Sequence, residues 1–399
     1  MSLKATASVT TFRFDRMATL INDRVDNPAE SGVERYVGLE HLDADSLRIR
    51  RWGEITDVES TKLRFQPGDI IFGKRRVYQR KLAVADFEGI CSAHAMVLRA
   101  KENVVLPEFL PFFMQSDRFM ERALAISVGS LSPTINWTTL AAEECALPPI
   151  EEQRRIAQAL AATSAVVDAL EYSRDQARKL YESALHMAFP MMVTRTKGET
   201  TDSSVPLGSV CEVRASGVDK HSREGEREAR LCNYLDVYRN GIIHSKMSFM
   251  KATATEREIE RYALRRGDVI ITKDSEEPTD IAVPARVAED MHDVLCGYHL
   301  AILRPDAKLI DSVYLTHCLR APASRVYFSA VAQGISRFGL TVDAIRSMPV
   351  PVRELKTQAQ TGQRLESLFE CLGLIGERIG SARGYQRSIR ETLLSGGVR

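Results

Sequence analysis

The feature that most constrains the fold of this chain is an internal repeat, in which a pattern of the first half returns once in the second half. Cys91–Arg99 reads Cys-x-x-His-x-x-Val-Leu-Arg, and 205 positions later Cys296–Arg304 reads Cys-x-x-His-x-x-Ile-Leu-Arg. Gly68–Ile71 returns in the same way, 199 positions later, as Gly267–Ile270. A unit of about 200 residues that occurs twice is far longer than the repeats of solenoids. The sequence therefore predicts a duplicated module that performs one task at two places.

The composition is that of an ordinary globular protein. Hydrophobic residues make up 44% and charged residues 27% of the 399 positions, a length that suggests two or three domains. No run of about 18 apolar residues is present and the start has no apolar signal core, so we expect a cytoplasmic protein without a membrane partner. The seven cysteines form no Cys-x-x-Cys pair, which indicates reduced thiols and no metal site. A net charge of +1 neither favours nor excludes nucleic acid, because binding needs only a local basic patch.

Each half of the sequence predicts an α+β domain followed by a long helix. Short β-branched runs between turn residues alternate with helical stretches, and the second half keeps the order of the first. We place the first domain at 1–150, a central spacer helix at 151–190, a polar linker at 191–205, the second domain at 206–352 and a C-terminal spacer helix at 353–399. If a pseudo-twofold axis relates the halves, the two helices run antiparallel and hold the domains at a fixed separation.

The two helices carry apolar residues at the spacing of three and four that is typical of a coiled coil. We expect the packing residues to be Ile156, Leu160, Val167, Leu170 and Tyr181 in the first helix and Leu365, Leu368, Leu372, Ile375 and Ile379 in the second. The second helix also contains Gly373, Gly376, Gly380 and Gly384. Each disfavours a helix by about 1 kcal/mol relative to alanine. Either another backbone approaches closely at these glycines, or the helix breaks near Gly373–Gly376.

The start of the first helix carries a family likeness. Leu147–Ile156 reads Leu-Pro-Pro-Ile-Glu-Glu-Gln-Arg-Arg-Ile behind an α+β domain, and this motif resembles type I restriction-modification DNA specificity (S) subunits. The Gly-Asp-Ile-Ile and Gly-Asp-Val-Ile segments with their Leu-Arg strands resemble the target recognition domains of that family, and the likeness covers essentially the whole chain. In the second copy, Pro351–Leu355 replaces the Pro-Pro-x-Glu-Glu-Gln motif. This difference leaves open whether both helix starts dock partners in the same way.

The resemblance implies a DNA-binding protein of host defence. In such proteins each domain reads one half of a bipartite, gapped target in double-stranded DNA. The helices space the domains and dock two methyltransferase (M) subunits, and restriction (R) subunits join that core. The chain is then non-catalytic and holds no cofactor, while S-adenosylmethionine, ATP and Mg²⁺ belong to the partners that methylate and cleave DNA. The sequence itself contains no base-methylation motif, no complete phosphate loop, no metal-spaced cluster and no persuasive nuclease carboxylates.

A basic segment follows the first Gly-Asp motif. Arginine and lysine neutralise phosphates or reach guanine edges, and glutamine pairs with adenine. The DNA contacts that we predict here are Lys74, Arg75, Arg76, Tyr78, Gln79, Arg80 and Lys81. A solvated charged turn is the alternative. Gly68–Lys74 also fits the spacing G-x-x-x-x-G-K, which keeps a nucleotide-binding enzyme as an alternative function, although Arg75 stands where a phosphate loop needs Ser or Thr.

The equivalent segment of the second domain provides one predicted DNA contact, Lys273, and is otherwise acidic, since Asp-Ser-Glu-Glu follows. Acidic side chains accept from cytosine amino groups but repel phosphate, so the two half-sites are expected to differ. Positive charge must come from elsewhere in this domain, for which we name Arg320, Arg325, Arg337 and Arg346. Matching polar loops precede the helices, and the DNA contacts predicted in them are Ser130, Ser132, Thr134, Gln333, Ser336 and Arg337. Ordinary connecting loops are the alternative.

Two pairs of repeated residues are expected to be structural. His94 and His299 are expected to be buried and hydrogen-bonded rather than catalytic, and Cys91 and Cys296 to be core thiols. A scaffold whose duplicated domains bind protein instead of DNA is a further alternative function.

Overall fold

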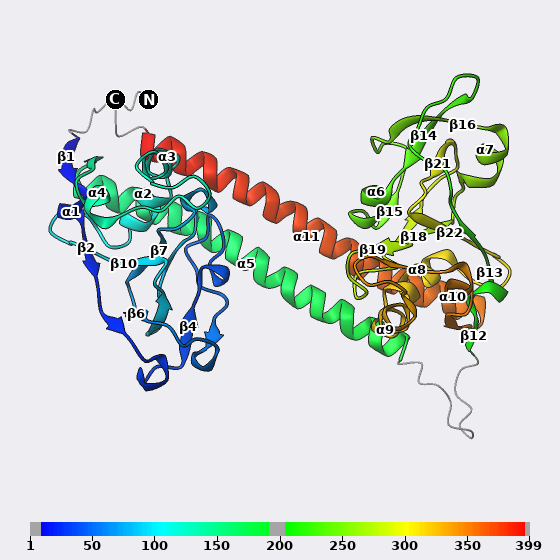
Figure 1. The fold of residues 1–399 in the computed structure, drawn as a ribbon, viewed down its shortest axis with the longest axis horizontal. Coiled ribbons are helices and arrows are strands. Elements are labelled where there is room, and N and C mark those ends of the chain that lie inside the picture. Colours follow the sequence, from blue (N-terminus) through cyan, green and yellow to red (C-terminus); the bar gives the residue numbers. More distant parts are fainter. Residues whose placement is uncertain (1–8, 191–203, 396–399) are drawn as a thin grey trace. The chain divides into compact units, whose positions relative to one another are not determined.

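The structure is a computed structural model of the chain, and it describes residues 9–190 and 204–395. The predicted linker at 191–205 lies outside these residues except for its last two positions. Helices and strands alternate through both halves, as the sequence predicts for an α+β fold, and a long helix follows each half (Figure 1). Within the described residues, no helix is both long enough and apolar enough to cross a membrane.

The chain divides into two compact units, and each long helix contributes to both. Residues 9–171 and 378–395 belong to the first unit, and residues 172–190 and 204–377 belong to the second. Each unit therefore consists of one α+β domain and segments of both long helices.

The first unit contains two main sheets. The four-stranded antiparallel sheet has the order β2 (Ala18–Ile21), β10 (Ala95–Ala100), β7 (Ile70–Gly73), β8 (Leu82–Val84). The five-stranded sheet has the order β3 (Arg24–Val25), β6 (Lys62–Phe65), β9 (Gly89–Ser92), β4 (Arg35–Val37), β5 (Gly53–Glu54). A two-stranded sheet pairs β1 (Thr10–Arg13) with β11 (Glu144–Leu147). The α-helices of this domain are α1 (Phe14–Met17), α2 (Leu110–Gln115), α3 (Asp117–Ala125) and α4 (Trp137–Ala141), and its 3-10 turns are η1 (Pro28–Glu30), η2 (Leu39–His41), η3 (Ile55–Asp57) and η4 (Val77–Gln79).

The second unit repeats this architecture with longer strands. Its five-stranded sheet has the order β13 (Cys211–Ala215), β22 (Leu300–Pro305), β18 (Val269–Thr272), β20 (Pro284–Val287), β15 (Ile242–Ile243). Its four-stranded sheet has the order β16 (Met250–Ala254), β14 (Arg227–Cys232), β21 (Met291–Cys296), β17 (Ala263–Leu264). The smaller sheets pair β12 (Ser204–Pro206) with β24 (Pro349–Pro351) and β19 (Asp274–Ser275) with β23 (Phe338–Gly339). The helices are η5 (Leu207–Ser209), α6 (Tyr234–Tyr238), α7 (Glu256–Tyr262), α8 (Ser312–Arg320), α9 (Pro322–Val331) and α10 (Val342–Arg346).

The repeated Gly-Asp motif introduces a fully buried strand in each unit. In β7, Ile70 and Phe72 pack with the helices of the domain, whereas Ile71 packs with the core of the five-stranded sheet. In β18, Val269 and Ile271 likewise separate from Ile270. This division follows from the period of two along a strand, which sends neighbouring side chains to opposite faces. A strand buried on both faces needs the continuous apolar run that both copies have.

The aspartate of each motif holds a turn and an arginine together. Asp69 is 1% exposed, accepts a hydrogen bond from the backbone N–H three residues before it (2.8 Å) and pairs with Arg99 (2.7 Å). Asp268 makes the same contacts, at 2.9 Å and with Arg304 at 2.7 Å. The Gly-Asp and Leu-Arg elements of the repeat are thus the two sides of one ion pair. Cys91 and Cys296 are fully buried, which confirms the prediction of core thiols.

The long helices are α5 (Ile150–Ala188) and α11 (Leu355–Ser395), and they run in opposite directions within each unit. In the first unit Gln386 donates to Ser164 (2.7 Å), and Arg383 pairs with Glu171. In the second unit the ring of Tyr181 lies 5.7 Å from that of Phe369, near the other end of each helix.

The expected packing residues divide between the helix pair and the domain cores. Ile156, Leu160, Val167, Tyr181, Leu365 and Ile379 are buried, and Leu170, Leu368, Leu372 and Ile375 are half-buried. Ile156 and Leu160 belong to the core of the first domain, while Leu365 belongs to the core of the second. The helices are therefore anchored in the domains as well as to each other.

The glycines of α11 do not break it, so the alternative that the helix breaks near Gly373–Gly376 is wrong. A Cβ atom built at any of the four glycines would meet nothing within 4 Å among the described residues. The explanation that we favoured, close approach of another backbone, therefore finds no support within the described part of this chain either.

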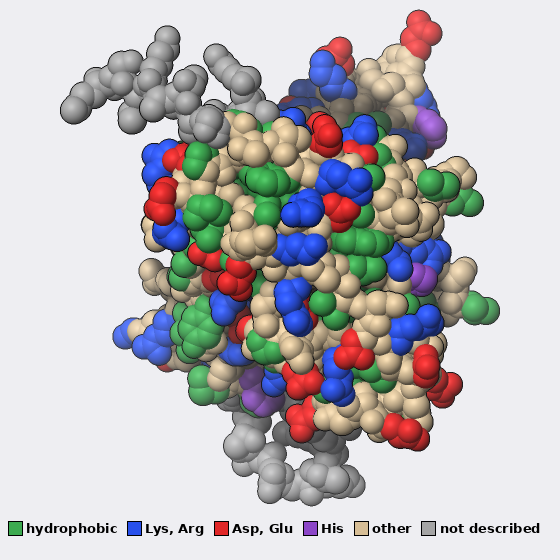
Figure 2. Space-filling view, turned by 90° about the vertical axis from the view of Figure 1, so that its left-hand side faces the viewer, with side chains coloured by type: hydrophobic (Ala, Val, Ile, Leu, Met, Phe, Trp, Pro, Cys, Tyr) green, Lys and Arg blue, Asp and Glu red, His purple; other side chains and the backbone are tan. Residues whose placement is uncertain are grey.

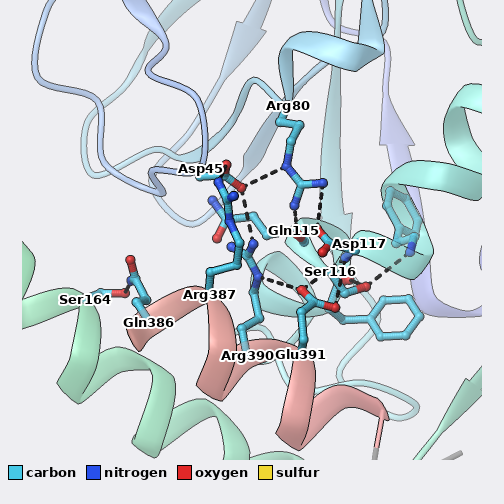
Figure 3. A network of polar contacts seen from close by, with 12 residues as sticks. Asp45, Arg80, Gln115, Ser116, Asp117, Ser164, Gln386, Arg387, Arg390 and Glu391 are labelled. Atoms are coloured by element: carbon cyan, nitrogen blue, oxygen red, sulfur yellow. Dashed lines mark hydrogen bonds and ion pairs between the residues drawn. The ribbon is translucent and has the colours of Figure 1, made fainter. Parts of the chain in front are cut away.

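Each unit fastens α11 in a different way. In the first unit Asp45 accepts from Arg80, Arg387 and Arg390, at 2.9, 3.0 and 3.3 Å (Figure 3). Burial raises the pKa of the Asp45 carboxyl, but the hydrogen bond and charge of Arg80, with the charges of Arg390 and Arg387, outweigh it and hold the pKa below its ordinary value. Glu391 meanwhile accepts from the first backbone N–H of α3, at Asp117 (3.2 Å).

In the second unit the attachment is a buried chain of hydrogen bonds. The Tyr181 hydroxyl bonds Nδ1 of His317 (2.9 Å), Nε2 of His317 bonds Glu366 (2.9 Å), and Arg286 donates to the other oxygen of Glu366 (2.7 Å). Burial lowers the pKa of His317 despite its hydrogen bond to Glu366. Burial alone would raise the pKa of Glu366, but the hydrogen bonds from His317 and Arg286 bring it to about 2. Glu366 is therefore ionised and His317 neutral near pH 7.

Candidate nucleic-acid interface

The basic segment after β7 lies against the polar loop that precedes α4. The backbone N–H of Ile135 donates to the carbonyl of Lys74 (3.0 Å), and that of Arg76 donates to the carbonyl of Pro133 (2.7 Å). The Arg76 side chain also donates from Nε to the Ser132 hydroxyl (3.2 Å). Two segments that the sequence analysis selected separately are thus brought into one constellation.

His94 joins this constellation from the turn before β10. The N–H groups of Lys74 and Arg75 both donate to its carbonyl (3.1 and 3.3 Å), and the Arg75 guanidinium lies 3.2 Å from its Nε2. Because arginine only donates, Nε2 must accept, which requires a neutral imidazole. Partial burial lowers the pKa of His94, and the charges of Arg75 and Lys74 lower it further. The prediction that His94 is buried is wrong, since its side chain is exposed, but its hydrogen bonding is as expected.

The other end of the basic segment turns towards the protein. Arg76 (φ 57°) and Arg80 (φ 54°) adopt the left-handed conformation on either side of η4, which reverses the chain direction. Arg80 donates to Asp45 and to the carbonyl of Gln115 (2.6 Å) and pairs with Asp117 (3.0 Å), as Figure 3 shows.

The remaining predicted contacts of this segment differ in their surroundings. Lys81 donates to the carbonyl of Leu39 (2.6 Å), so its ammonium group, like the Arg80 guanidinium, is engaged by the chain itself. Tyr78 is 53% exposed, and Gln79 is half-buried. These contacts favour positioning roles for Arg80 and Lys81, while Tyr78 faces solvent.

The second unit builds the same backbone constellation. The N–H of Lys273 donates to the carbonyl of His299 (2.9 Å), and the N–H of Leu340 donates to the carbonyl of Lys273 (2.9 Å). At the position of Arg75 stands Asp274, whose carboxylate lies 2.6 Å from Nδ1 of the half-buried His299. Arg337 approaches the same imidazole from the loop, with Nη2 3.4 Å from Nε2. The charge at the position of Arg75 is therefore reversed: Asp274 provides an anion next to Lys273, and the loop provides the cation Arg337.

The loops close in the same way in both units and expose an apolar tip. Isolated bridges join Val128 to Thr134 and Gln333 to Gly339. Leu131 is 92% exposed and Ile335 is 97% exposed, and the predicted contacts Ser130 and Ser336 are also exposed.

Glycine begins the tight part of each loop. Gly129 and Gly334 have φ of 110° and 147°, a conformation that other residues rarely adopt. At Gly334 a Cβ atom would lie 1.9 Å from the carbonyl oxygen of Arg337, so only glycine fits. The two loops therefore have a defined backbone conformation that requires glycine, and they are not irregular connections.

One face of the first unit carries mixed charge. On the face that Figure 2 turns to the viewer, Lys and Arg side chains alternate with Asp and Glu and with hydrophobic side chains. Among the arginines that we named as sources of positive charge in the second domain, Arg320 is only 7% exposed, so that expectation is wrong for it. Arg325, Arg337 and Arg346 are exposed. Any phosphate-binding surface must therefore be formed by small groups of neighbouring Lys and Arg side chains rather than by one large positive face.

One functional residue that the sequence analysis missed is Gln358, in the first turn of α11. The Gln153 amide, at the start of α5, accepts from the N–H of Leu106 (2.9 Å) and donates to the carbonyls of Pro148 (3.0 Å) and Val104 (3.4 Å). The Gln358 amide makes the equivalent bonds to Asp311 (3.0 Å), Arg353 (2.7 Å) and Leu309 (3.1 Å). The second helix start thus keeps the glutamine and loses only the residues around it. The 205-position offset of the repeat was the signal that pointed to Gln358.

The structure does not support the alternative that Gly68–Lys74 binds a nucleotide. Ile70–Gly73 is a buried β-strand, whereas a phosphate loop is an open turn whose N–H groups face the ligand. Among the described residues, no group of three or more His, Cys, Asp or Glu side chains is arranged to hold a metal ion.

The two α+β units thus share one backbone arrangement of strand end, histidine and loop, and they differ in the charged side chains placed on it. A family model described as the type I restriction modification DNA specificity domain matches residues 50–176. The chain is 26% identical over 227 residues to the specificity subunit of the type I restriction enzyme EcoDI of Escherichia coli, covering 53% of this chain and 50% of that subunit. It is 21% identical over 394 residues to the StySPI specificity subunit of Salmonella potsdam, covering 90% of this chain and 83% of that subunit.

Solved structures agree in fold. The S subunit of a type I restriction-modification system from M. genitalium has a TM-score of 0.60 at 15% identity and covers 98% of both chains. A chain from a study of complex assembly and conformational transition of the type I R-M system has a TM-score of 0.53 at 17% identity, with 97% of both chains covered. The chain is thus similar to type I restriction-modification DNA specificity subunits, both in sequence and in fold. The first of the curated relatives is matched over about half of its length.

Proposed function

We propose that the chain is the non-catalytic, sequence-specific DNA-binding subunit of a cytoplasmic type I restriction-modification complex, and that it reads a bipartite, gapped target. Two methyltransferase subunits and restriction subunits are its proposed protein partners, and these carry the S-adenosylmethionine, ATP and Mg²⁺. The observation that carries the proposal is the duplicated constellation of strand end, histidine and loop, which has the same backbone bonds but different side chains in the two units.

In the first unit the proposed DNA contacts are cationic. Lys74, Arg75 and Arg76 belong to the constellation at the strand end, and Ser132 and Thr134 lie on the facing loop. A guanidinium held by an imidazole loses less freedom on binding than a free one, and arginine pairs well with the O6 and N7 atoms of guanine. Each phosphate neutralised by this unit makes the logarithm of the affinity fall by about 0.9 per tenfold rise in salt.

In the second unit the proposed contacts combine an acceptor with donors. The Asp274 carboxylate accepts from amino groups such as N4 of cytosine, while Lys273 and Arg337 bind phosphate or guanine. Gln333 and Ser336 are the further proposed contacts of the loop. Since a carboxylate and a guanidinium favour different bases, the two halves of the target are expected to differ in sequence.

The two long helices are proposed to set the gap between the half-sites and to carry the docking surfaces for the methyltransferase subunits. The supporting observation is that α5 contributes residues to the cores of both domains, and that α5 and α11 also contact each other in each unit. The equivalent bonds of Gln153 and Gln358 support equivalent geometry at the two helix starts.

The test is a selection from random duplex DNA by the chain, alone and together with a type I methyltransferase subunit. We expect two short, unlike sequence elements at a fixed gap, with affinity that falls steeply as salt rises. Selection of a single uninterrupted element, or affinity that ignores salt, would contradict the proposal and favour a scaffold that binds protein.

A further inference from the structure

The two units contain equivalent cavities between the domain and the long helices. In the first unit the cavity measures about 280 Å³ and its lining includes Gln115, Ser164 and Gln386. In the second it measures about 350 Å³ and its lining includes Arg320, Phe369 and Tyr181. Each of these three pairs of positions is separated by the offset of the repeat, 205 residues. The duplication has therefore preserved the cavity while changing the chemistry of its walls.

Arg320 gives the second cavity a buried positive charge. Its guanidinium carbon lies 3.7 Å from the ring centroid of Phe369, and Nη2 donates to the carbonyl of Gly241 (3.1 Å). Nη1 is buried and has no geometrically well-formed hydrogen bond among the described residues, although the guanidinium lies close enough to Tyr181 for the two groups to interact. A buried polar group of this kind indicates an ion, a water or a ligand that completes its hydrogen bonds.

The nearby acid does not neutralise Arg320. Glu366 is held by Arg286 (2.7 Å) and His317 (2.9 Å), and the part of the chain that the structure describes places no carboxylate within ion-pairing distance of Arg320. Arg239 and Arg325 line the same cavity, against one carboxylate, that of Asp280, which accepts from the Tyr238 hydroxyl (2.7 Å). The lining thus has an excess of positive charge, which favours an anion.

The remaining walls are apolar. Phe369 and the side chains of Ile281, Pro284 and Leu319 line the cavity beside the arginines. A volume of about 350 Å³ lies at the lower end of the range of small-molecule sites, about 300 to 1,000 Å³, and such sites combine apolar walls with a few fixed polar groups.

The cavity of the first unit lacks the unpaired buried arginine that the cavity of the second unit has. Gln115 replaces Arg320, and it too has a buried Nε2 without a partner among the described residues. The arginines around that cavity are paired within the chain, in the contacts Arg48–Asp168, Arg50–Asp168, Arg383–Glu171, Arg387–Asp45 and Arg390–Asp45. Of the two cavities, and among the residues that the structure describes, the second alone has a buried guanidinium without a carboxylate partner.

We propose that the cavity of the second unit binds a small organic anion, whose carboxylate or phosphate group pairs with Arg320 and whose apolar body lies against Phe369. This assignment is independent of DNA binding. Because Tyr181 belongs to α5, Phe369 to α11 and Arg320 to α8, a bound anion would link both long helices to the second domain.

The test is calorimetric titration of the full chain with benzoate, phenyl phosphate and inorganic phosphate at constant ionic strength. We expect one saturable site per chain for benzoate or phenyl phosphate and weaker binding of inorganic phosphate. Arg320→Gln installs the residue of the equivalent first-unit position, and it should weaken binding by about tenfold or more, the usual consequence of losing a charge-assisted hydrogen bond. Arg325→Gln, at an exposed position that does not endanger folding, should weaken binding severalfold.

The controls separate this site from the proposed DNA contacts. The double variant Arg75→Ala with Arg76→Ala should bind the probes like the unmodified chain, and thermal unfolding should show that Arg320→Gln is folded. Absence of saturable binding for all three probes at millimolar concentration would overturn the proposal. So would unchanged binding in both Arg320→Gln and Arg325→Gln, or equal affinity for inorganic phosphate and phenyl phosphate, since the apolar walls would then have no part in binding.

Discussion

The two units use one backbone arrangement to present opposite charges. In both, the residue after the buried strand donates its N–H to a histidine carbonyl, and a loop residue donates back to that same strand-end residue. Yet Arg75 contacts His94 in the first unit and Asp274 contacts His299 in the second. The difference teaches that the fold fixes where a side chain is presented, whereas its chemistry changes freely after duplication.

A second comparison concerns how each domain holds α11. The first unit uses partly exposed ion pairs around Asp45, and the second uses the buried chain of Tyr181, His317 and Glu366. Exposed ion pairs contribute little and tolerate substitution. Removing one partner of a buried pair leaves an uncompensated charge in a medium of low polarity. The two attachments should therefore fail under different perturbations.

The largest expected effect comes from shortening both helices. Deleting one heptad from each of α5 and α11 removes about 10 Å of helix, which corresponds to about three base pairs of DNA. We expect the preferred gap between the half-sites to shorten or assembly to be lost, with the sequence preference of each half unchanged in any complex that forms. Selection from random DNA measures this, and an unchanged gap would remove the spacing role from the helices.

The next effect tests the buried attachment. Glu366→Ala leaves Arg286 and His317 without their carboxylate, and we expect the free energy of unfolding of the second unit to fall by about 3 to 5 kcal/mol. Denaturant titration followed by hydrogen exchange locates the loss. Glu370→Ala, at an exposed position one turn further along α11, should change stability by less than about 0.5 kcal/mol. Equal effects of the two substitutions would show that the Glu366 contacts contribute little.

Because Arg75 and Asp274 carry opposite charges at equivalent positions, substitutions at each should affect the recognition of only one DNA half-site. Arg75→Ala with Arg76→Ala should weaken binding by about 1 to 3 kcal/mol and relax the sequence preference of one half-site, while Asp274→Asn should alter only the other half-site. Binding of duplexes with substitutions in each half measures both. Arg16→Ala, which removes an exposed charge from the same unit as Arg75, serves as the control. Equal loss at both half-sites would argue against one domain per half-site.

The smallest expected effect is a difference between the two attachments of α11 in how their stability depends on pH. The pKa of His317 is lowered from 6.5, so the unfolded chain binds this proton more tightly and stability falls as the pH drops below about 6.5. Glu366, with a pKa of about 2 instead of 4.5, adds a loss below about pH 4.5. At the first-unit attachment of α11, the lowered pKa of Asp45 adds a loss only below its ordinary value of 3.8. The lowered pKa of His94 also adds a loss below about pH 6.5 in this unit, but His94 lies at the strand end after β9 and not on α11.

We therefore expect the amides of α8 and the start of α11 to lose exchange protection, on lowering the pH from 7 to about 5, before those at the end of α11. The loss should not exceed about 1.4 kcal/mol per pH unit for each group. His317→Asn should abolish the component near pH 6.5. Loss of protection at both ends of α11 at the same pH would contradict the distinction between the two attachments.

Much of this architecture could be predicted because its signals are local. The apolar runs Ile70–Phe72 and Val269–Ile271 mark buried strands, and their repeated position beside Gly-Asp indicates duplication. The long helices could be predicted from apolar spacing and from the prolines before the first of them. In the same way, the burial of Cys91 and Cys296 follows from their place at the end of apolar strands.

Which charged side chains are exposed, and which are buried or paired, could not be predicted from the sequence. Nothing near Arg80 in the sequence shows that its guanidinium meets Asp45 and Asp117, which lie 35 and 37 positions away. Arg320 was expected on the surface, but it is covered by Phe369 and by the loop that contains Gly241. Whether a charge is exposed or neutralised depends on the distant groups that folding places beside it.

The sequence by itself determined the duplicated α+β modules, their long helices and the positions where polar groups are presented, because hydrophobic periodicity and turn residues act over short distances. Only the tertiary structure decided which of those groups point outward, that Gln358 takes the role of Gln153, and that Arg320 lines a cavity. These outcomes depend on ion pairs and hydrogen bonds between residues far apart in the chain, whose energies exist only once the helices and sheets have packed.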